Sequence, residues 1–197
     1  MSRRLRCIVD SDGITANFFQ ALFDQHHSAT GEQVHISQIK SWDMSKHVKN
    51  PVKLMSIFRQ PGFFRYLDPI PGALAGLKKI MNDGHDVLIA THACTPHAAS
   101  EKIDWFSRYA SFIPSNKIWI GADKHELRGD VLIDDGTHNA EKQRQAVPDS
   151  LILTIAYPHN EHHVYDGRFG ASEDYKEIDY RKAWEDIYQA IKKKAHS

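Results

Sequence analysis

The sequence has few cysteines, no excess of either charge and no long apolar run. Its longest apolar stretch is residues 87–90, far short of the roughly 20 residues that cross a bilayer. Lys plus Arg and Asp plus Glu both number 25, whereas duplex nucleic acid binds a basic surface. Cys7 and Cys94 are too few for a disulfide framework, and the first residues lack the apolar stretch of a secretory signal. We therefore expect a cytoplasmic protein without a membrane span or a duplex partner.

Short apolar runs alternate with helix-like stretches along the chain. Helices are predicted from Pro71 to Gly84, after Thr95 with Ala99 and Ile103 on the buried face, and around Trp184. The continuous apolar runs, typical of buried parallel strands, are residues 5–9, 87–90, 117–120, 131–133 and 151–156. This alternation predicts an α/β fold, a Rossmann-like three-layer core with a central parallel sheet.

One segment breaks the alternation. Residues 18–67 hold several aromatic residues among polar ones and are interrupted by glycine and proline. The segment follows the first predicted strand, at the edge of the sheet where ligands bind in open α/β folds. We therefore predict a small helical cap at residues 18–67, inserted into a core made of residues 1–17 and 68–197.

Acidic residues directly follow two of the predicted strands. Asp10 and Asp12 come after the first strand, and Asp134 and Asp135 come after the fourth. If these strands are parallel neighbours, all four carboxylates meet at one edge of the sheet. Carboxylates so close repel one another unless a cation lies among them, and oxygen ligands favour Mg²⁺. Acidic residues are also common in turns, but two such pairs predict a metal site.

Two further polar residues belong to the same predicted edge. Thr91 ends the strand at residues 87–90 and supplies a hydroxyl group, and Lys124 precedes the fourth strand and supplies an ammonium group. Together with the carboxylates and a metal ion, these groups are the components of a phosphoryl-transfer site. The structural alternatives are a capping threonine and a solvent-exposed lysine.

These four groups of residues resemble the motifs of the haloacid dehalogenase-like phosphatases, in the same order and on the same predicted elements. Longer stretches resemble one family of that superfamily, the 5'(3')-deoxyribonucleotidases. They are residues 61–74, with the sequence Pro-Gly-Phe-Phe-Arg-Tyr-Leu-Asp-Pro-Ile-Pro-Gly-Ala-Leu, and residues 123–135, which keep the family's internal spacing. Residues 159–162 and the last helix also have counterparts. The similarity covers nearly the whole chain and thins between residues 20 and 55.

The resemblance implies an Mg²⁺-dependent phosphatase that hydrolyses (deoxy)ribonucleoside monophosphates through an aspartyl-phosphate. It implies that Asp10 is the nucleophile. Asp12 would protonate the leaving oxygen and then activate water, and its main-chain oxygen would contact the metal. Asp135 would be a side-chain ligand of the metal, and Asp134 would lie in its outer shell or bind through water. A homodimer is also implied, because family members are often dimers.

The resemblance further implies how the substrate is bound. Thr91 and Lys124 would bind the phosphoryl group, and Phe18 aligns with a family aromatic residue that stacks on the base. His92 stands where the family commonly has serine. The other expected pocket residues are Trp42, Phe58 and Phe64. The alternative for all of these aromatic residues is core packing.

Other reactive residues are interpreted as structural. The histidines of residues 159–163 lack the spacing of a zinc site, so we assign them to a loop, followed by a turn-like stretch at residues 165–169. Cys94 has histidines nearby in sequence but is not expected to be a nucleophile.

Three functional alternatives stay open. One is a phosphatase for another small phosphomonoester, such as a sugar phosphate or a nucleic-acid 3'-phosphate. Another is transfer of the phosphoryl group to an acceptor other than water. The third is a non-catalytic nucleotide-binding protein. The presence of Asp12 argues against it, because a protein that only binds nucleotides needs no proton donor.

Overall fold

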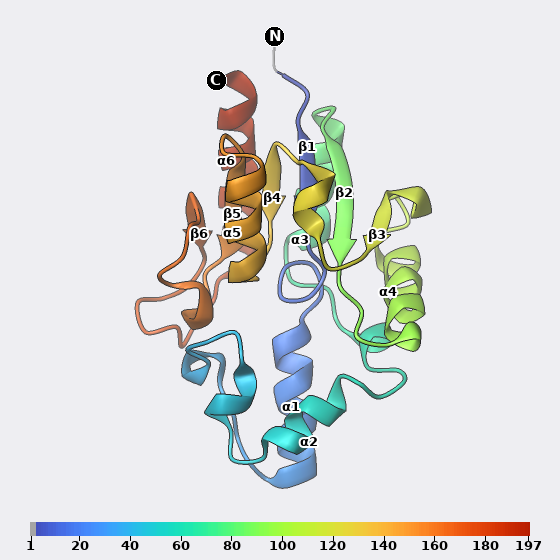
Figure 1. The fold of residues 1–197 in the computed structure, drawn as a ribbon, viewed down its shortest axis with the longest axis vertical. Coiled ribbons are helices and arrows are strands. Elements are labelled where there is room, and N and C mark those ends of the chain that lie inside the picture. The colour runs from blue at the N-terminus through green and yellow to red at the C-terminus, as the bar shows by residue number, and fades with distance from the viewer. Residues whose placement is uncertain (1–2) are drawn as a thin grey trace.

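The protein is built on one six-stranded parallel sheet. The computed structural model describes residues 3–197 (Figure 1). The strands are β1 (Arg6–Val9), β2 (Asp86–Thr91), β3 (Ile118–Ile120), β4 (Val131–Ile133), β5 (Leu151–Ile155) and β6 (Gly167–Phe169). Their order across the sheet is β3-β2-β1-β4-β5-β6, and every neighbouring pair is parallel. The predicted α/β fold with a central parallel sheet is confirmed.

Helices cover both faces of the sheet (Figure 1). The α-helices are α1 (Phe18–Thr30), α2 (Pro51–Ile57), α3 (Ala73–Asn82), α4 (Pro96–Tyr109), α5 (Thr137–Ala146) and α6 (Tyr180–His196). The 3₁₀-helices are η1 (Ile36–Gln38), η2 (Met44–His47), η3 (Phe64–Tyr66), η4 (Ser115–Lys117), η5 (Lys124–Leu127) and η6 (Pro158–Asn160). The predicted start of α4 is confirmed, because the Thr95 side chain accepts a hydrogen bond from the Ala98 N–H at 3.2 Å.

The two faces of the sheet build two separate apolar clusters. Alternate strand residues such as Val9 and Ile133 point into the larger cluster, where α3, α4 and α6 pack. Ile8 and Leu132 point the other way, into a small cluster closed by Ala140 of α5. Strands β1, β2, β4 and β5 therefore contribute buried residues to both clusters, which explains why they are continuous apolar runs in the sequence. Among residues 3–197, no helix has the length and the apolarity to cross a membrane.

The structure differs from the expected elements in three places. The stretch predicted as turn-like contains strand β6, which pairs with β5. Strand β6 has three residues with Arg168 in the middle, so it is too short and too polar to show a strand pattern in the sequence. No helix was expected over α5, because few of its residues are apolar. The predicted buried face of α4, with Ala99, Ile103, Phe106 and Ala110, is confirmed at Phe106 and Ala110 and wrong at Ile103, which is 40% exposed. The face turned inward also carries Glu101 and Lys102.

Residues 18–67 lie beyond the carboxyl ends of the strands (Figure 1). They contain α1, η1, η2, α2 and η3, and helices α1 and α2 pack against each other. Asn17 donates a backbone hydrogen bond to Asp68 O at 2.8 Å, so the chain leaves and re-enters the sheet region at adjacent points. The arrangement agrees with a cap inserted after β1, and the division of the chain at residues 17 and 67 stays a prediction.

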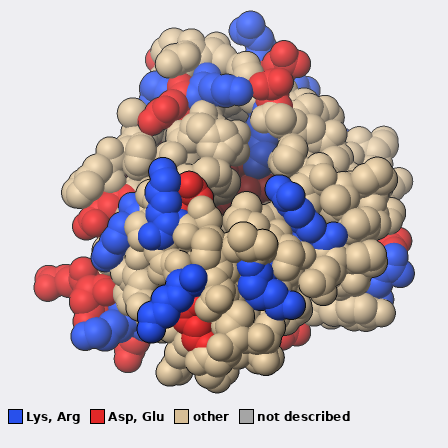
Figure 2. Space-filling model, turned by 60° about the horizontal axis from the view of Figure 1, so that its bottom comes forward, with Lys and Arg blue, Asp and Glu red and all other residues tan. Residues whose placement is uncertain are grey.

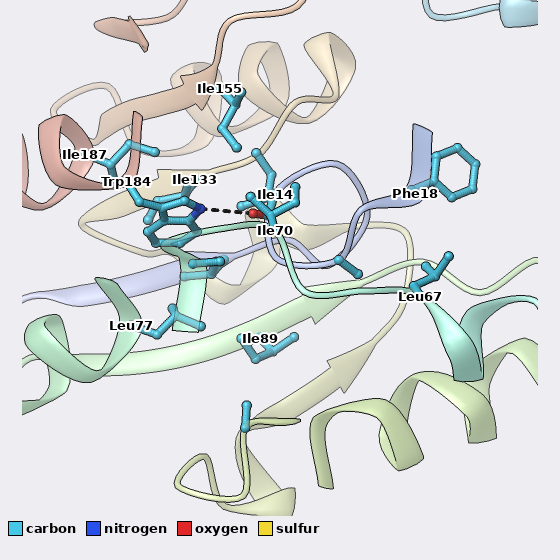
Figure 3. Packing of buried hydrophobic residues seen from close by; sticks show 14 of the residues in the cluster. Ile14, Phe18, Leu67, Ile70, Leu77, Ile89, Ile133, Ile155, Trp184 and Ile187 are labelled. Atoms are coloured by element: carbon cyan, nitrogen blue, oxygen red, sulfur yellow. Dashed lines mark hydrogen bonds between the residues drawn. The ribbon is translucent and has the colours of Figure 1, made fainter. Parts of the chain in front are cut away.

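Trp184 of α6 ties the last helix to the loop after β1. Its indole is 1% exposed and packs among residues of the larger cluster (Figure 3). The indole Nε1–H donates a hydrogen bond to Ile14 O at 3.2 Å. Gly76 of α3 leaves room for the ring, because a Cβ there would lie 2.5 Å from Trp184 Cε3. The C-terminal helix therefore supports the segment that follows Asp12.

We expect Trp184→Ala to lower the free energy of unfolding by about 3–5 kcal/mol, because it leaves a large cavity and removes a buried hydrogen bond. Trp42→Ala is the matched control, since Trp42 is 48% exposed, and it should cost less than about 1 kcal/mol. Urea unfolding of both variants measures the difference. Equal losses in the two variants would contradict this account of the core.

Candidate active site

The predicted polar residues converge at the carboxyl edge of the sheet. Asp10 follows β1, Thr91 ends β2, Lys124 begins η5, and Asp134 and Asp135 follow β4. A cavity of about 530 Å³ opens above this edge. Asp10, Thr91, Lys124 and Asp135 line it, and Asp134 lies behind them, fully buried. The structure therefore brings together residues that are up to 125 positions apart in the sequence.

The loop after β1 is shaped by its own hydrogen bonds. Ser11 N–H donates to Asp10 Oδ1 at 2.7 Å, and Ser11 O accepts from the backbone N–H groups of Thr15 and Ala16, both at 2.8 Å. Gly13 has a φ of +71°, and a Cβ at this position would lie 2.9 Å from the Phe19 ring and 3.0 Å from Asp135 Oδ2. Glycine is therefore required both by the backbone conformation and by the nearby carboxylate.

Three buried carboxylates cluster at and behind the floor of the cavity. Side-chain oxygens of Asp10, Asp134 and Asp135 lie within 4.8 Å of one another. The Lys124 ammonium lies 2.7 Å from Asp10 Oδ1 and 2.7 Å from Asp134 Oδ2. Asp134 also accepts hydrogen bonds from Gly136 N–H at 2.8 Å and from the Asn139 side chain at 3.1 Å. Lys124 is thus buried between two carboxylates rather than exposed at the surface.

The charges of this cluster do not balance. Three carboxylates and one ammonium leave two negative charges in a buried site. Burial raises the pKa of Asp134 to about 7 against the opposing effect of Lys124, and burial also raises the pKa of Asp135. Burial by itself would lower the pKa of Lys124, but Asp10 and Asp134 outweigh it and raise that pKa. A divalent cation bound by carboxylate oxygens would neutralise the excess charge, so the residues present fit a hard metal ion.

Asp12 lines the same cavity at the expected edge of the sheet, but its side chain lies outside the close cluster of the other three carboxylates. Its carboxylate instead forms an ion pair with the Lys102 ammonium of α4. Lys102 is 2% exposed in its side chain and also donates to Thr91 Oγ1 at 2.9 Å. Burial raises the pKa of Asp12, and Lys102 opposes this effect. Asp12 therefore pairs with a lysine of its own, whereas Asp10 and Asp134 share Lys124.

Sequence reasoning missed Lys102, although a signal for it is present. Lys102 lies four residues after Ala98 and three before Trp105, which are both buried on one face of α4. A lysine in the middle of an apolar helical face requires a buried partner. Its partner, Asp12, lies 90 positions away in the sequence, so the pattern reveals the lysine but not its partner.

Glu101, the residue before Lys102, links α4 to the end of the cap segment. Its side-chain oxygens accept hydrogen bonds from the backbone N–H groups of Gly62 at 2.5 Å and Phe64 at 3.2 Å. The Phe64 ring lies under the Lys102 ammonium, 4.4 Å from ring centroid to Nζ. Two adjacent residues of α4 therefore have different partners in the site. Glu101 holds the backbone at Phe64, whose ring lines the cavity, and Lys102 holds the Asp12 carboxylate.

All of the expected pocket residues line the cavity. Phe18 and Phe64 are buried and stack with their rings 6.2 Å apart, and the half-buried Phe58 meets the edge of Phe18 at 5.7 Å. Trp42 and His92 are exposed at its rim. Phe18 and Phe64 belong to the apolar core as well, so the core-packing alternative is confirmed for these two, and base stacking stays a prediction. Cys94 also lines the cavity.

His159 does not behave as a loop histidine. It lies in η6 after β5, is 4% exposed, and has its Nε2 3.2 Å from Asp135 Oδ2. His162, three residues later, has an 89% exposed side chain, as expected for a loop histidine. The sequence could not separate the two, because their difference in burial is decided by how η6 packs on the loop after β4.

The cavity opens at the end of the molecule that carries residues 18–67. Figure 2 shows a recess in this face, with acidic and basic atoms at its floor and further lysine or arginine side chains around it. Carboxylates on a rigid sheet edge, buried ammonium groups and a threonine hydroxyl surround one accessible space. This arrangement can hold a metal ion and a phosphoryl group together.

Solved structures share this fold. A haloacid dehalogenase-like family hydrolase from Xanthomonas campestris superposes with a TM-score of 0.53 at 13% identity, over 100% of this chain and 99% of that one. D,D-heptose 1,7-bisphosphate phosphatase from Bordetella bronchiseptica, solved with magnesium and phosphate, superposes with a TM-score of 0.50 at 12% identity, over 94% and 99%. The chain therefore has the fold of the haloacid dehalogenase-like hydrolases.

Sequence comparison defines the family. The family model described as 5' nucleotidase, deoxy (pyrimidine), cytosolic type C protein matches residues 3–195. The human cytosolic-type 5'(3')-deoxyribonucleotidase is 29% identical over 175 residues, which cover 83% of this chain and 86% of the human protein. The chain belongs to this 5'-nucleotidase family and is an enzyme of the hydrolase class. The resemblance seen in the motifs is thereby confirmed.

We expect Lys102→Met to lower the free energy of unfolding by about 3 kcal/mol at neutral pH, because it leaves the Asp12 carboxylate without its cation. Lys182→Met is the matched control. The Lys182 ammonium lies 2.6 Å from Asp186 in a pair that solvent reaches, with the Lys182 side chain 64% and the Asp186 side chain 32% exposed, so the loss should stay below about 0.5 kcal/mol.

Urea unfolding measures both losses. Adding Asp12→Asn to Lys102→Met should restore part of the stability, because the double variant no longer buries an unpaired charge. If Lys102→Met cost no more than Lys182→Met, the pair would not be the buried interaction described above.

Proposed function

We propose that the protein is an Mg²⁺-dependent phosphomonoesterase that hydrolyses (deoxy)ribonucleoside monophosphates through an aspartyl-phosphate on Asp10. The observation that carries the proposal is the position of Asp10. Its carboxylate lies at the floor of a cavity of about 530 Å³, with Oδ1 held by Lys124 and by Ser11 N–H. A cavity of this size suits a small-molecule substrate. Within residues 3–197, Asp10 Oδ2 has no hydrogen-bond partner, so this oxygen is available to act as a nucleophile or a ligand.

The metal ion is assigned to the carboxylate cluster. Asp10 and Asp135 would supply side-chain oxygens and Asp12 its main-chain oxygen. Asp134 would act from the outer shell or through water, because both of its side-chain oxygens already accept hydrogen bonds. Bound there, Mg²⁺ would neutralise charge on the phosphoryl oxygens and on Asp10. Without that neutralisation, an anionic nucleophile would have to approach an anionic phosphate.

The chemistry needs two steps. In the first, an Asp10 carboxylate oxygen attacks phosphorus, the bond from phosphorus to the nucleoside oxygen breaks, and Asp12 gives its proton to that oxygen. In the second, water attacks the aspartyl-phosphate, Asp12 takes the proton from the water, and inorganic phosphate leaves. The raised pKa of Asp12 supports its role as an acid. Thr91 and Lys124 would hold the phosphoryl oxygens during both steps.

The nucleoside would lie against the cap. Phe18, Phe58 and Phe64 form an aromatic wall of the cavity, and Trp42 and His92 lie at its rim. Stacking of a base on such rings contributes about 1–3 kcal/mol. This wall favours a nucleotide over a sugar phosphate, which has no planar ring to stack. A cytoplasmic location and a homodimer complete the proposal, and the human relative's description as a cytosolic type supports the location.

A phosphate-release screen tests the substrate class. With Mg²⁺, we expect release from nucleoside monophosphates to exceed release from sugar phosphates and from a 3'-phosphorylated oligonucleotide by at least about fivefold, the least that one stacked base supplies. Removing Mg²⁺ with EDTA should abolish release, and adding it back should restore it. Faster release from sugar phosphates would contradict the nucleotide proposal. Tight nucleotide binding without hydrolysis in Mg²⁺ would contradict the enzymatic one.

We expect Asp10→Asn to reduce phosphate release by at least about 10³-fold, because an amide is not a competent nucleophile. The variant should keep its fold, since asparagine has nearly the same shape. Asp149→Asn, an exposed position after α5, is the control and should leave release unchanged. Far-ultraviolet circular dichroism verifies the fold. Substantial activity in well-folded Asp10→Asn would overturn the aspartyl-phosphate mechanism.

A further inference from the structure

His159 is a buried side chain beside the carboxylate cluster to which the chemistry above gives no role. Its ring stacks on Tyr157, 5.4 Å between centroids and 11° between planes. The rings of Phe19 and Trp42 also contact it, each at a centroid distance of 5.6 Å. Because three aromatic rings surround the imidazole, its orientation is fixed by packing.

This orientation directs one nitrogen at Asp135. His159 Nε2 lies 3.2 Å from Asp135 Oδ2, which is an ion-pair distance, and within residues 3–197 this nitrogen forms no hydrogen bond. An isolated buried imidazole nitrogen is costly, because burial removes its hydrogen bonds to water. Its position beside a carboxylate therefore points to a role that packing alone does not explain.

Asp135 depends on this contact more than its neighbours do. Asp10 is held by Ser11 N–H and Lys124, and Asp134 is held by Lys124, Gly136 N–H and Asn139. For Asp135, His159 is the one side chain within residues 3–197 that forms an ion pair or hydrogen bond with the carboxylate. The carboxylate expected to bind the metal directly is thus oriented by a single polar group.

The same histidine is joined to the loop that carries the nucleophile. Tyr157, on which His159 stacks, donates a hydrogen bond from its hydroxyl group to Gly13 O at 2.7 Å. The chain after β5 therefore reaches both loops of the cluster, the loop after β1 through Tyr157 and the loop after β4 through His159. Both loops must keep a fixed separation if their carboxylates are to share one ion.

We propose that His159 is a positioning residue that orients Asp135 for the divalent metal ion and so sets the affinity of the site. This inference rests on the metal site of the proposed function. The imidazole would donate from Nε2 to Asp135 Oδ2, leaving the other oxygen for the metal. Partners that orient ligating carboxylates typically change metal affinity by about 10–100-fold when they are removed.

The test measures Mg²⁺ binding by titration calorimetry without substrate. His159→Phe keeps an aromatic ring against Tyr157 but has no donor, and it should weaken Mg²⁺ binding by about 10–100-fold. His159→Gln keeps an N–H donor near the same position and should recover most of the affinity. His162→Gln changes an exposed histidine of the same segment and should bind Mg²⁺ as the unchanged protein does.

Thermal unfolding in EDTA separates this role from a general loss of stability. The proposal expects His159→Phe and His159→Gln to unfold at similar temperatures without metal and to differ when Mg²⁺ is present. If His159→Phe does not fold, His159→Met against His159→Gln gives the same comparison at matched size. Equal Mg²⁺ affinity in folded variants with and without the donor would overturn the proposal. Absence of Mg²⁺ binding by the unchanged protein would overturn the metal site itself, a separate result.

Discussion

Repulsion among three buried carboxylates is the constraint on which the rest of the site depends. Asp10, Asp134 and Asp135 lie within 4.8 Å of one another, and Lys124 compensates one of their three charges. Such a cluster is stable only if a rigid frame holds it and a cation completes it. The frame is the parallel pair β1 and β4, whose register sets Val9 beside Ile133 and so brings the two acidic loops together.

Two neighbouring residues of α4 link the second ion pair of the site to the cap. Lys102 holds Asp12 and Thr91, and Glu101 holds the backbone of Gly62 and Phe64. Both residues extend from the buried face of α4, so one helix connects the proposed acid with an aromatic wall of the substrate cavity.

Much of the fold could be predicted because its signals are local. Five of the strands are apolar runs, and Thr95 followed by proline marks the start of α4. Strand β6 and helix α5 could not be predicted, because three residues around Arg168 form no pattern and α5 is mostly polar. Both are held by tertiary contacts instead: β6 pairs with β5, and Ala140 of α5 closes the small cluster.

By itself, the sequence determined the chemistry available at the edge of the sheet, because acidic residues placed directly after two buried strands must emerge there. It also determined the aromatic composition of the cap. Only the tertiary structure decided which charges pair. Asp12 turns to Lys102 rather than to the other carboxylates, and His159 is buried against Asp135 while His162 is exposed. Such choices depend on desolvation and on the packing of distant segments, which are properties of the folded chain and not of any local run of residues.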